Sequence, residues 1–185
     1  MNAAEKQLIA LTTRPHLSQP ARHVVEDPFI YLRVFLAELG NPEQKIPHYI
    51  NVTGTSCKGS TAAYIASILQ ASKQRVGLTV SPHITTMRER WQINGQPIPQ
   101  AEFATLVKRL TIAFNQCVKH DPQFGLSFFE LCTALALVYF VKQKVEWAVL
   151  EVFSGGRVDP TNIIPRKDAA VITTIGLDHE RLLGN

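Results

Sequence analysis

A short β-branched run that stops at a loop of small residues constrains the fold of this chain most strongly. The run Tyr49–Thr53 has the composition of a buried strand and ends at Gly54. A helical pattern follows from about residue 58 to 72, with apolar spacing at Ile65, Ile68 and Leu69. A strand that turns into a helix in this way offers backbone N–H groups and the positive end of the helix to an anion. We therefore predict a phosphate-binding loop.

The loop itself departs from the Walker pattern G-x-x-x-x-G-K-[ST] at two positions. Cys57 precedes the lysine where glycine is expected, and Gly59 follows it where a hydroxyl is expected. A hydroxyl for a metal must therefore come from elsewhere, and a plain P-loop kinase is disfavoured. Lys58 is expected to act catalytically beside the phosphates of a nucleotide. The expected nucleotide-binding residues are Gly54, Thr55, Ser56, Cys57, Lys58, Gly59, Ser60 and Thr61.

The remaining apolar runs alternate between strand-like and helix-like patterns. We expect helices at 29–39, 100–119 and 128–142, strands at 75–80, 147–152 and 169–175, and a hairpin across Asn94-Gly95. The last two strands are bounded by Gly, Pro and Asp, as fully buried parallel strands are. The pattern predicts an α/β fold, a P-loop NTPase-like, doubly wound and mainly parallel sheet with flanking helices. Residues 1–28 form an N-terminal segment with no assigned element.

The amino-acid composition indicates which kinds of protein the chain can be. The chain has 185 residues, 45% of them hydrophobic, which suits one sizeable core. Its 19 basic and 15 acidic residues are spread along the sequence, so we expect no nucleic acid partner. The longest apolar run, 131–141, is too short for a bilayer, so we expect no membrane contact and a cytoplasmic location. Three isolated cysteines predict reduced thiols.

Polar residues follow each predicted parallel strand, where such sheets bind ligands. Glu151 is the best carboxylate for magnesium, which prefers hard oxygen ligands. Ser81 is the candidate for the missing hydroxyl, with Ser60 and Thr61 as alternatives. A structural salt bridge from Glu151 to Arg157 is the simpler interpretation of the same carboxylate. Four segments follow the strands: 54–61, 81–83, 151–159 and 176–179.

Six motifs in this order resemble those of the folylpolyglutamate synthase/dihydrofolate synthase family, which belongs to the Mur ligase superfamily. Their order along the chain is more specific than any single motif. They are Gly54–Thr61, Thr79-Val80-Ser81-Pro82-His83, Arg88-Glu89-Arg90 with Ile93-Asn94-Gly95, Ser127–Glu130, Leu150–Asn162 and Gly176-Leu177-Asp178-His179.

The resemblance implies an ATP-dependent ligase that adds L-glutamate to dihydropteroate or a folate through an acyl phosphate. ATP, glutamate and the pteroate or folate substrate would be its partners, Mg²⁺ its cofactor, and a monomer its state when complete. The matching family positions imply that Mg²⁺ is bound by Ser81, Glu151 and His179. They imply that the pterin-bearing substrate contacts Ser127, Phe128, Phe129, Glu130, Val158, Asp159 and Pro160.

Three departures from the family pattern bear on activity. Ser56 and Cys57 stand where the family has asparagine and glycine, and a side chain at Cys57 could crowd a phosphate. Phe153-Ser154 replaces a small, aliphatic pair. Beyond Asn185 the family continues with a carbamylated lysine and a C-terminal glutamate-ligase domain, so residues 29–185 are interpreted as the N-terminal part of the ATP-binding domain of a truncated chain. The alternatives are an inactive or merely nucleotide-binding fragment and another Mur-type amino-acid ligase.

Simpler interpretations remain for several of these residues. Phe128 and Phe129 begin a helix and would also suit the core. Arg88 and Arg90 are interpreted as a solvated face of the hairpin, with contact to a substrate carboxylate as the lesser alternative. Cys57 lacks an adjacent base in the sequence, which disfavours a role as a nucleophile.

Overall fold

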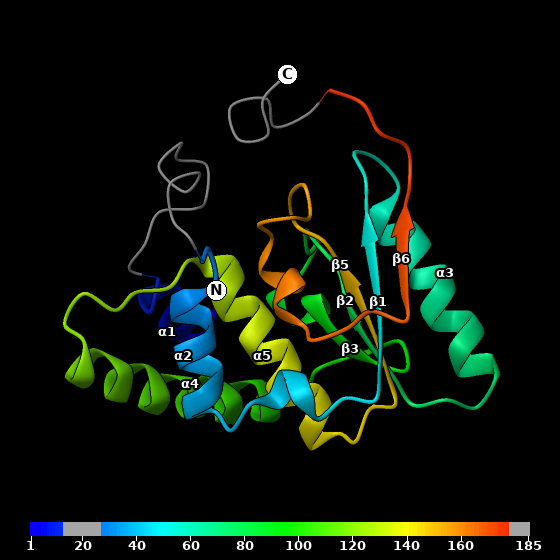
Figure 1. Ribbon diagram of the computed structural model, residues 1–185. Helices are drawn as coiled ribbons and strands as arrows, with labels where there is room; N and C mark the ends of the chain where they lie inside the picture. The colour runs from blue at the N-terminus through cyan, green and yellow to red at the C-terminus, as the bar shows by residue number, and fades with distance from the viewer. Residues whose placement is uncertain (13–26, 178–185) are drawn as a thin grey trace.

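A six-stranded sheet forms the centre of the protein in the computed structural model, which describes residues 1–12 and 27–177 (Figure 1). The strand order is β4-β3-β2-β5-β1-β6. Four strands run parallel, namely β2 (Val76–Thr79), β5 (Trp147–Glu151), β1 (His48–Thr53) and β6 (Ala169–Ile172). The hairpin β3 (Trp91–Ile93) and β4 (Gln96–Pro97) adds to them antiparallel. The predicted α/β sheet is confirmed.

The register of the parallel strands brings their carboxyl ends to one edge of the sheet. Val52 of β1 is level with Glu151 of β5, and Thr79 of β2 is level with Leu150. Glu151 therefore lies at the end of its strand, beside the turns that leave β1 and β2. The crossover through α3 (Lys58–Ala71) places β5 between β1 and β2, so that the predicted strand exits adjoin one another.

Helix α3 covers one face of the sheet by itself (Figure 1). Its fully buried side chains are Ala62 and Ala66, which allow the helix to approach the strands closely. The predicted apolar face was partly wrong, because Ile68 is 67% exposed while Ile65 and Leu69 are half-buried. Small residues rather than large ones mark the buried side of this helix. The strand residues packed against it are Ile50, Val52, Val76, Leu78 and Val149.

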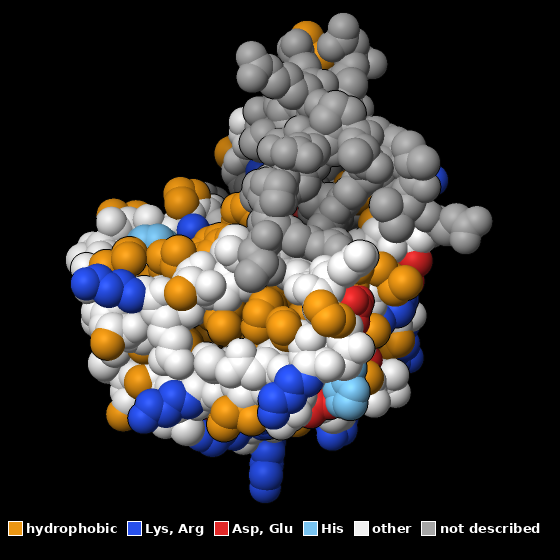
Figure 2. All heavy atoms as spheres, turned by 90° about the vertical axis from the view of Figure 1, so that its left-hand side faces the viewer, with side chains coloured by type: hydrophobic (Ala, Val, Ile, Leu, Met, Phe, Trp, Pro, Cys, Tyr) orange, Lys and Arg blue, Asp and Glu red, His pale blue; other side chains and the backbone are white. Residues whose placement is uncertain are grey.

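The other helices cover the opposite face of the sheet, where the larger core lies. Helix α5 (Phe128–Lys142) is buried without interruption from Glu130 to Phe140. A helix that is apolar all round belongs in the middle of a core, and α5 packs against the helices α2 (Ile30–Glu38) and α4 (Gln100–His120). Figure 2 shows this helical side of the molecule, with lysine and arginine side chains scattered over it.

Helix α1 (Ala3–Ala10) was not expected from the sequence. It starts with a capping box in which Asn2 Oδ1 accepts the amide of Glu5 at 3.0 Å and Glu5 Oε2 accepts the amide of Asn2 at 2.8 Å. Its buried residues Ala4 and Leu8 join the larger core. The N-terminal residues are therefore packed onto the domain rather than separate from it.

Strand β6 differs from its prediction as a fully buried strand. It is an edge strand of four residues, and Ile172 is 63% exposed. An apolar run of this length suits a buried or an exposed strand equally, so the pattern did not distinguish them. The prediction that the strand extends to Ile175 was also wrong.

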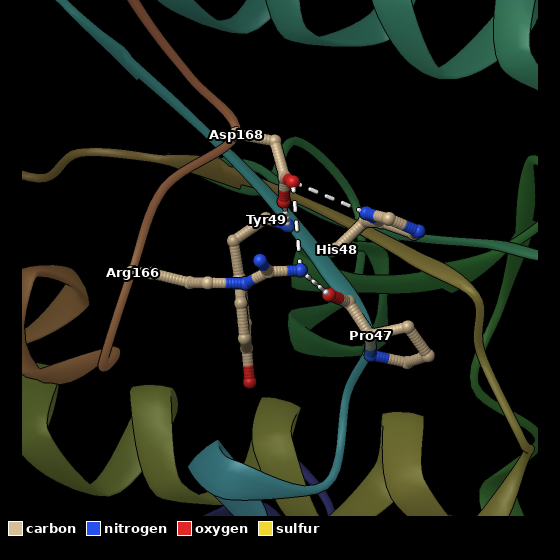
Figure 3. Close-up of polar contacts among 5 residues, drawn as sticks. All are labelled: Pro47, His48, Tyr49, Arg166 and Asp168. Atoms are coloured by element: carbon tan, nitrogen blue, oxygen red, sulfur yellow. Dashed lines mark hydrogen bonds and ion pairs between the residues drawn. The ribbon is translucent and has the colours of Figure 1, made fainter.

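Hydrogen bonds of Asp168 link the start of β6 to the start of β1 (Figure 3). Its Oδ2 accepts the amide of Tyr49 at 2.8 Å, and its Oδ1 lies 3.2 Å from His48 Nδ1. Arg166 Nη2 lies 3.7 Å from Asp168 Oδ1 and donates to the carbonyl of Pro47 at 3.0 Å. These contacts lower the pKa of Asp168, the Tyr49 amide first among them. They lie at the opposite end of the strands from the predicted site.

Among the described helices, none is both long enough and apolar enough to span a membrane.

Candidate active site

The loop between β1 and α3 has the geometry of an anion site. Gly54 leaves the strand at φ 136°, and Cys57 precedes the helix in the left-handed region at φ 63°. The amides of 56–60 have no hydrogen-bond partner in the described part of the chain. These N–H groups and the positive end of the α3 dipole together favour a negatively charged ligand.

Cys57 is exposed and does not cap the helix with its side chain. Residues with a Cβ adopt its left-handed backbone at a cost, which glycine avoids. All three cysteines are free, and Cys117 and Cys132 are buried. Burial raises the pKa of Cys132 to about 12, as expected for a thiol that serves as a small apolar side chain.

The segment after β6 holds the loop in place, a role that sequence reasoning missed. Thr55 donates its amide to the carbonyl of Thr174 at 2.8 Å, and its hydroxyl lies 3.0 Å from both the amide and the carbonyl of Gly176. Thr173 Oγ1 lies 2.6 Å from the carbonyl of Ser56. A Cβ at Gly54 would lie 2.0 Å from that hydroxyl, so only glycine fits. The pair Thr173-Thr174 directly after an apolar run was the available signal.

Lys58 lies at the mouth of the loop. Its Nζ donates to the carbonyl of Gly54 at 2.8 Å and is 3.4 Å from that of Thr55. The ammonium therefore sits beside the unpartnered amides, where a phosphate would meet both. A cavity of about 260 Å³ opens here, lined by Thr53, Gly54, Thr55, Lys58, Phe153, Ser154, Gly155, Ile172, Ile175 and Gly176.

Glu151 is a buried carboxylate, 3% exposed, at the end of β5. Its Oε2 accepts the amide of Ser81 at 2.7 Å. Burial raises the pKa of Glu151, and the Ser81 amide, Lys58 and Arg90 act in the opposite direction. The simpler interpretation, a salt bridge to Arg157, is wrong, because Arg157 is exposed and the structure of the described residues has no ion pair between it and the buried Glu151.

Gly59 explains how this carboxylate fits beside the loop. A Cβ at Gly59 would lie 3.2 Å from Glu151 Oε2 and 3.6 Å from Oε1. The space that a side chain after the lysine would need is therefore taken by Glu151. A buried carboxylate next to the half-buried Ser81 provides hard oxygen atoms, which fit Mg²⁺.

The third predicted metal ligand, His179, lies outside the described residues, as does Asp178. Within 1–12 and 27–177, no group of three or more His, Cys, Asp or Glu side chains is arranged for a metal ion. The structure thus brings together the loop, Ser81 and Glu151, and leaves the position of His179 as a prediction.

Ser127 and Glu130, two predicted substrate residues, form the capping box of α5. Glu130 Oε2 lies 2.7 Å from both the amide and the hydroxyl of Ser127. Both residues are buried, and these bonds order the start of the helix. The intervening rings are half-buried, with Phe128 beneath Arg90 and Phe129 packed on Phe153 at 4.4 Å between ring centroids.

Asp159, another predicted substrate residue, organises its own loop. It is 2% exposed and accepts hydrogen bonds from the amides of Phe153, Ser154 and Thr161 and from the Thr161 hydroxyl. Burial raises the pKa of Asp159, and these four bonds oppose the rise. Its neighbour Val158 is half-buried, and Pro160 is buried at the start of a 3₁₀ turn. The carboxylate thus shapes the wall that carries Phe153.

The interpretation of Arg90 as a solvated residue was wrong. Its side chain is buried, with the residue only 8% exposed, whereas the neighbouring Arg88 donates to the carbonyl of Ile98 at 2.9 Å. The short turn Met87–Arg90 directs the two arginines to different surroundings. No periodicity in so short a segment distinguishes them.

Comparison with known proteins places these features in a family. A folylpolyglutamate synthase from Lacticaseibacillus casei is 42% identical over 150 residues, which cover 81% of this chain. A dihydrofolate synthase/folylpolyglutamate synthase from Bacillus subtilis is 40% identical over 158 residues, or 83% of this chain. Over most of its length the chain is homologous to folylpolyglutamate/dihydrofolate synthases. It spans 35% of the length of each of these two relatives. No protein-family model matches it.

Solved structures of folylpolyglutamate synthases share the fold. The apo form of the L. casei enzyme superposes over 100% of this chain with a TM-score of 0.86 at 36% identity, and this chain covers 43% of it. An FPGS-AMPPCP-folate complex gives a TM-score of 0.86 at 37% identity, also with 43% of its length covered. An E. coli FolC structure with DHPP and ADP gives 0.79 at 31% identity and is 39% covered. The described strands and helices are therefore those of this family.

Proposed function

We propose that this chain forms the ATP- and magnesium-binding part, together with part of the acceptor pocket, of a cytoplasmic ligase that joins L-glutamate to dihydropteroate or a folate. One observation carries the proposal. The unpartnered amides of 56–60 and the Lys58 ammonium lie at the same sheet edge as the buried carboxylate of Glu151 and the adjacent Ser81. This combination of anion site and hard oxygen ligands suits a nucleotide triphosphate with Mg²⁺.

The chemistry requires two displacements. An oxygen of the acceptor carboxylate attacks the γ-phosphorus of ATP, ADP leaves, and an acyl phosphate forms. The amine of glutamate then attacks the acyl carbon, phosphate leaves, and the nitrogen loses a proton to give the amide. The first step brings negative charges together, and the loop amides and Lys58 offset them. Glu151 and Ser81, with His179, would hold Mg²⁺, which neutralises phosphate charge when bound.

The acceptor would lie against the aromatic side of the site. Phe128 and Phe129 offer half-buried rings to a flat pterin or aminobenzoyl group, and the loop ordered by Asp159 supports Phe153 behind Phe129. Ser127 and Glu130 fix the helix that carries both rings. The folate and DHPP complexes of related proteins support an acceptor of this class.

Calorimetric titration of the chain with Mg-ATP tests the nucleotide part of the proposal. Lys58→Ala is expected to weaken binding by about tenfold or more, because a charge-assisted hydrogen bond contributes about 1.5–3 kcal/mol. Lys108→Ala, an exposed lysine on α4, is the matched control and should bind as the unaltered chain does. Absence of Mg-ATP binding by the unaltered chain would overturn the proposal.

The same titration with Ser81→Ala tests the metal hydroxyl. If Ser81 replaces the hydroxyl missing at Gly59, nucleotide affinity should fall in the presence of Mg²⁺ and stay unchanged in its absence. Equal binding with Mg²⁺ would assign that role to Ser60 or Thr61.

A further inference from the structure

Arg90 is a buried guanidinium with one unsatisfied end. The residue is 8% exposed, and its Nη1 is buried with no hydrogen-bond partner among the residues that the structure describes. A buried charged donor without a partner is costly. A ligand group or an ordered water usually satisfies such an atom.

Two neighbours fix the orientation of this side chain. Arg90 Nε donates to His83 Nδ1 at 3.0 Å, and the guanidinium lies over the ring of Phe128 at 5.5 Å from the centroid. A guanidinium held on one edge and supported on one face has little freedom to turn. The free Nη1 is therefore preorganised to bind an acceptor group.

A cavity of about 530 Å³ adjoins Arg90, within the range of small-molecule sites. Residues 1–12, which include helix α1, form one wall, and Thr12 Oγ1 is also buried there without a partner in the described residues. Glu5 belongs to this wall too, but its carboxylate already accepts the amide of Asn2. The apolar part of the lining comes from Met1, Ile9, Met87 and Phe128.

Arg90 also lies close enough to the proposed metal site to influence it. Its charge is one of those that act on the buried carboxylate of Glu151. His83, which fixes Arg90, follows Ser81 by two residues on the same strand exit. A ligand group held by Arg90 would therefore lie near the strand exit that carries Ser81.

We propose that Arg90 binds the carboxylate of the acceptor substrate, with the aromatic ring that bears this carboxylate packed in the cavity beside Phe128. The inference rests on the proposed function, since it names the residue that receives the group to be phosphorylated. It assigns His83 as a positioning residue that acts through Arg90. The ligand class is an aromatic carboxylate, whose negative charge complements the guanidinium and whose oxygens can accept from the unpartnered Nη1.

Binding of dihydropteroate and of its carboxamide analogue, each titrated without nucleotide, tests the proposal. The unaltered chain should bind the carboxylate about tenfold or more tightly than the carboxamide, as hydrogen bonds to charged groups contribute about 1.5–3 kcal/mol. Arg90→Met should bind both ligands equally. Arg90→Lys, which retains the charge without the guanidinium, should keep a reduced preference.

Arg88→Met is the matched control, because Arg88 is on the same turn and its guanidinium is engaged by the Ile98 carbonyl. This variant should keep the full preference for the carboxylate. Arg90→Met should remain folded in a thermal melt, because it removes an unsatisfied buried charge. If Arg90→Met does not fold, Arg90→Lys is the test of the proposal. An undiminished preference of Arg90→Lys for the carboxylate over the carboxamide would overturn the proposal.

An undiminished preference in Arg90→Met, or no preference in the unaltered chain, would equally overturn it. Mg-ATP titration separates this result from the proposed function. Lys58→Ala should bind Mg-ATP about tenfold or more weakly while retaining the full preference for the carboxylate. A chain that prefers the carboxylate through Arg90 but binds no Mg-ATP would refute the proposed function and leave this inference standing.

Discussion

The carboxylate of Glu151 occupies the space that a side chain at Gly59 would need, with Oε2 at 3.2 Å from the position of a Cβ. Gly59 lies in the first turn of α3, and Glu151 ends β5. A side chain at Gly59 would therefore require the Glu151 carboxylate to shift. The loop and the carboxylate thus form one unit at the end of the sheet.

Gly59→Ala should separate function from stability. The added methyl group displaces Glu151 and should weaken Mg-ATP binding, by about tenfold if one charge-assisted contact is lost. Alanine is a better helix former than glycine by about 1 kcal/mol. The melting temperature should therefore not fall, although the affinity for Mg-ATP does. Calorimetry and a thermal melt measure the two effects. Ser67→Ala, at an exposed position on the same helix, should leave affinity unchanged, and a Gly59→Ala chain with full affinity would contradict the prediction.

Cys57→Gly should improve the loop. The left-handed backbone at φ 63° costs a residue with a Cβ about 1 kcal/mol, which glycine does not pay. For a chain of this size that corresponds to a rise of about 2–4 °C in the melting temperature. Mg-ATP affinity should rise as well, because the side chain no longer crowds the phosphates. Cys57→Ala keeps the Cβ and should show no thermal gain; unchanged or lower affinity in Cys57→Gly would show that the cysteine is accommodated.

Glu151→Gln should stabilise the protein while weakening Mg-dependent binding. Burial raises the pKa of Glu151, so the folded state holds its proton more tightly than the unfolded state does. The ionised carboxylate therefore costs stability at neutral pH, and this cost disappears as the pH falls below the unfolded value of about 4.3. Urea unfolding at pH 7 should show the variant as the more stable form, with a smaller difference near pH 4. If the difference in the free energy of unfolding instead grew on acidification, the pKa of Glu151 would be lowered rather than raised by folding.

Asp168→Asn should remove an acid-sensitive contribution to stability. The Tyr49 amide and His48 lower the pKa of Asp168 in the folded state, so its carboxylate stabilises the fold above the unfolded pKa of about 3.9. That contribution is lost as the pH falls through the pKa that Asp168 has in the folded state. The unaltered chain should therefore be the more stable of the two at pH 7, and urea curves of the two proteins should converge as the pH falls from the unfolded pKa through the lower folded one.

Local chemistry explains why the strand exits were predictable. Gly54 and Lys58 carry their signal in a few consecutive residues, and parallel strands bring their carboxyl ends together by geometry alone. The predicted position of Ser81 beside Glu151 follows from the same rule, and the 2.7 Å contact between them confirms their proximity.

Tertiary context explains what the sequence did not reveal. The burial of Arg90 depends on packing over Phe128 of α5, which is distant in sequence, and the exposure of β6 depends on which strand lies at the edge. Helix α1 did carry a local signal, since Asn2 and Glu5 have the spacing of a capping box. Its short apolar pattern was too weak for that signal to be interpreted.

The phosphate-binding loop and the segment after β6 support one another, because Thr55 and Ser56 are bonded to residues 173–176. Ordering of either segment therefore favours ordering of the other. Amide hydrogen exchange in the two segments should slow together when nucleotide binds. The segment that leaves β6 would in this way report occupancy of the loop, although it lies more than a hundred residues away along the chain.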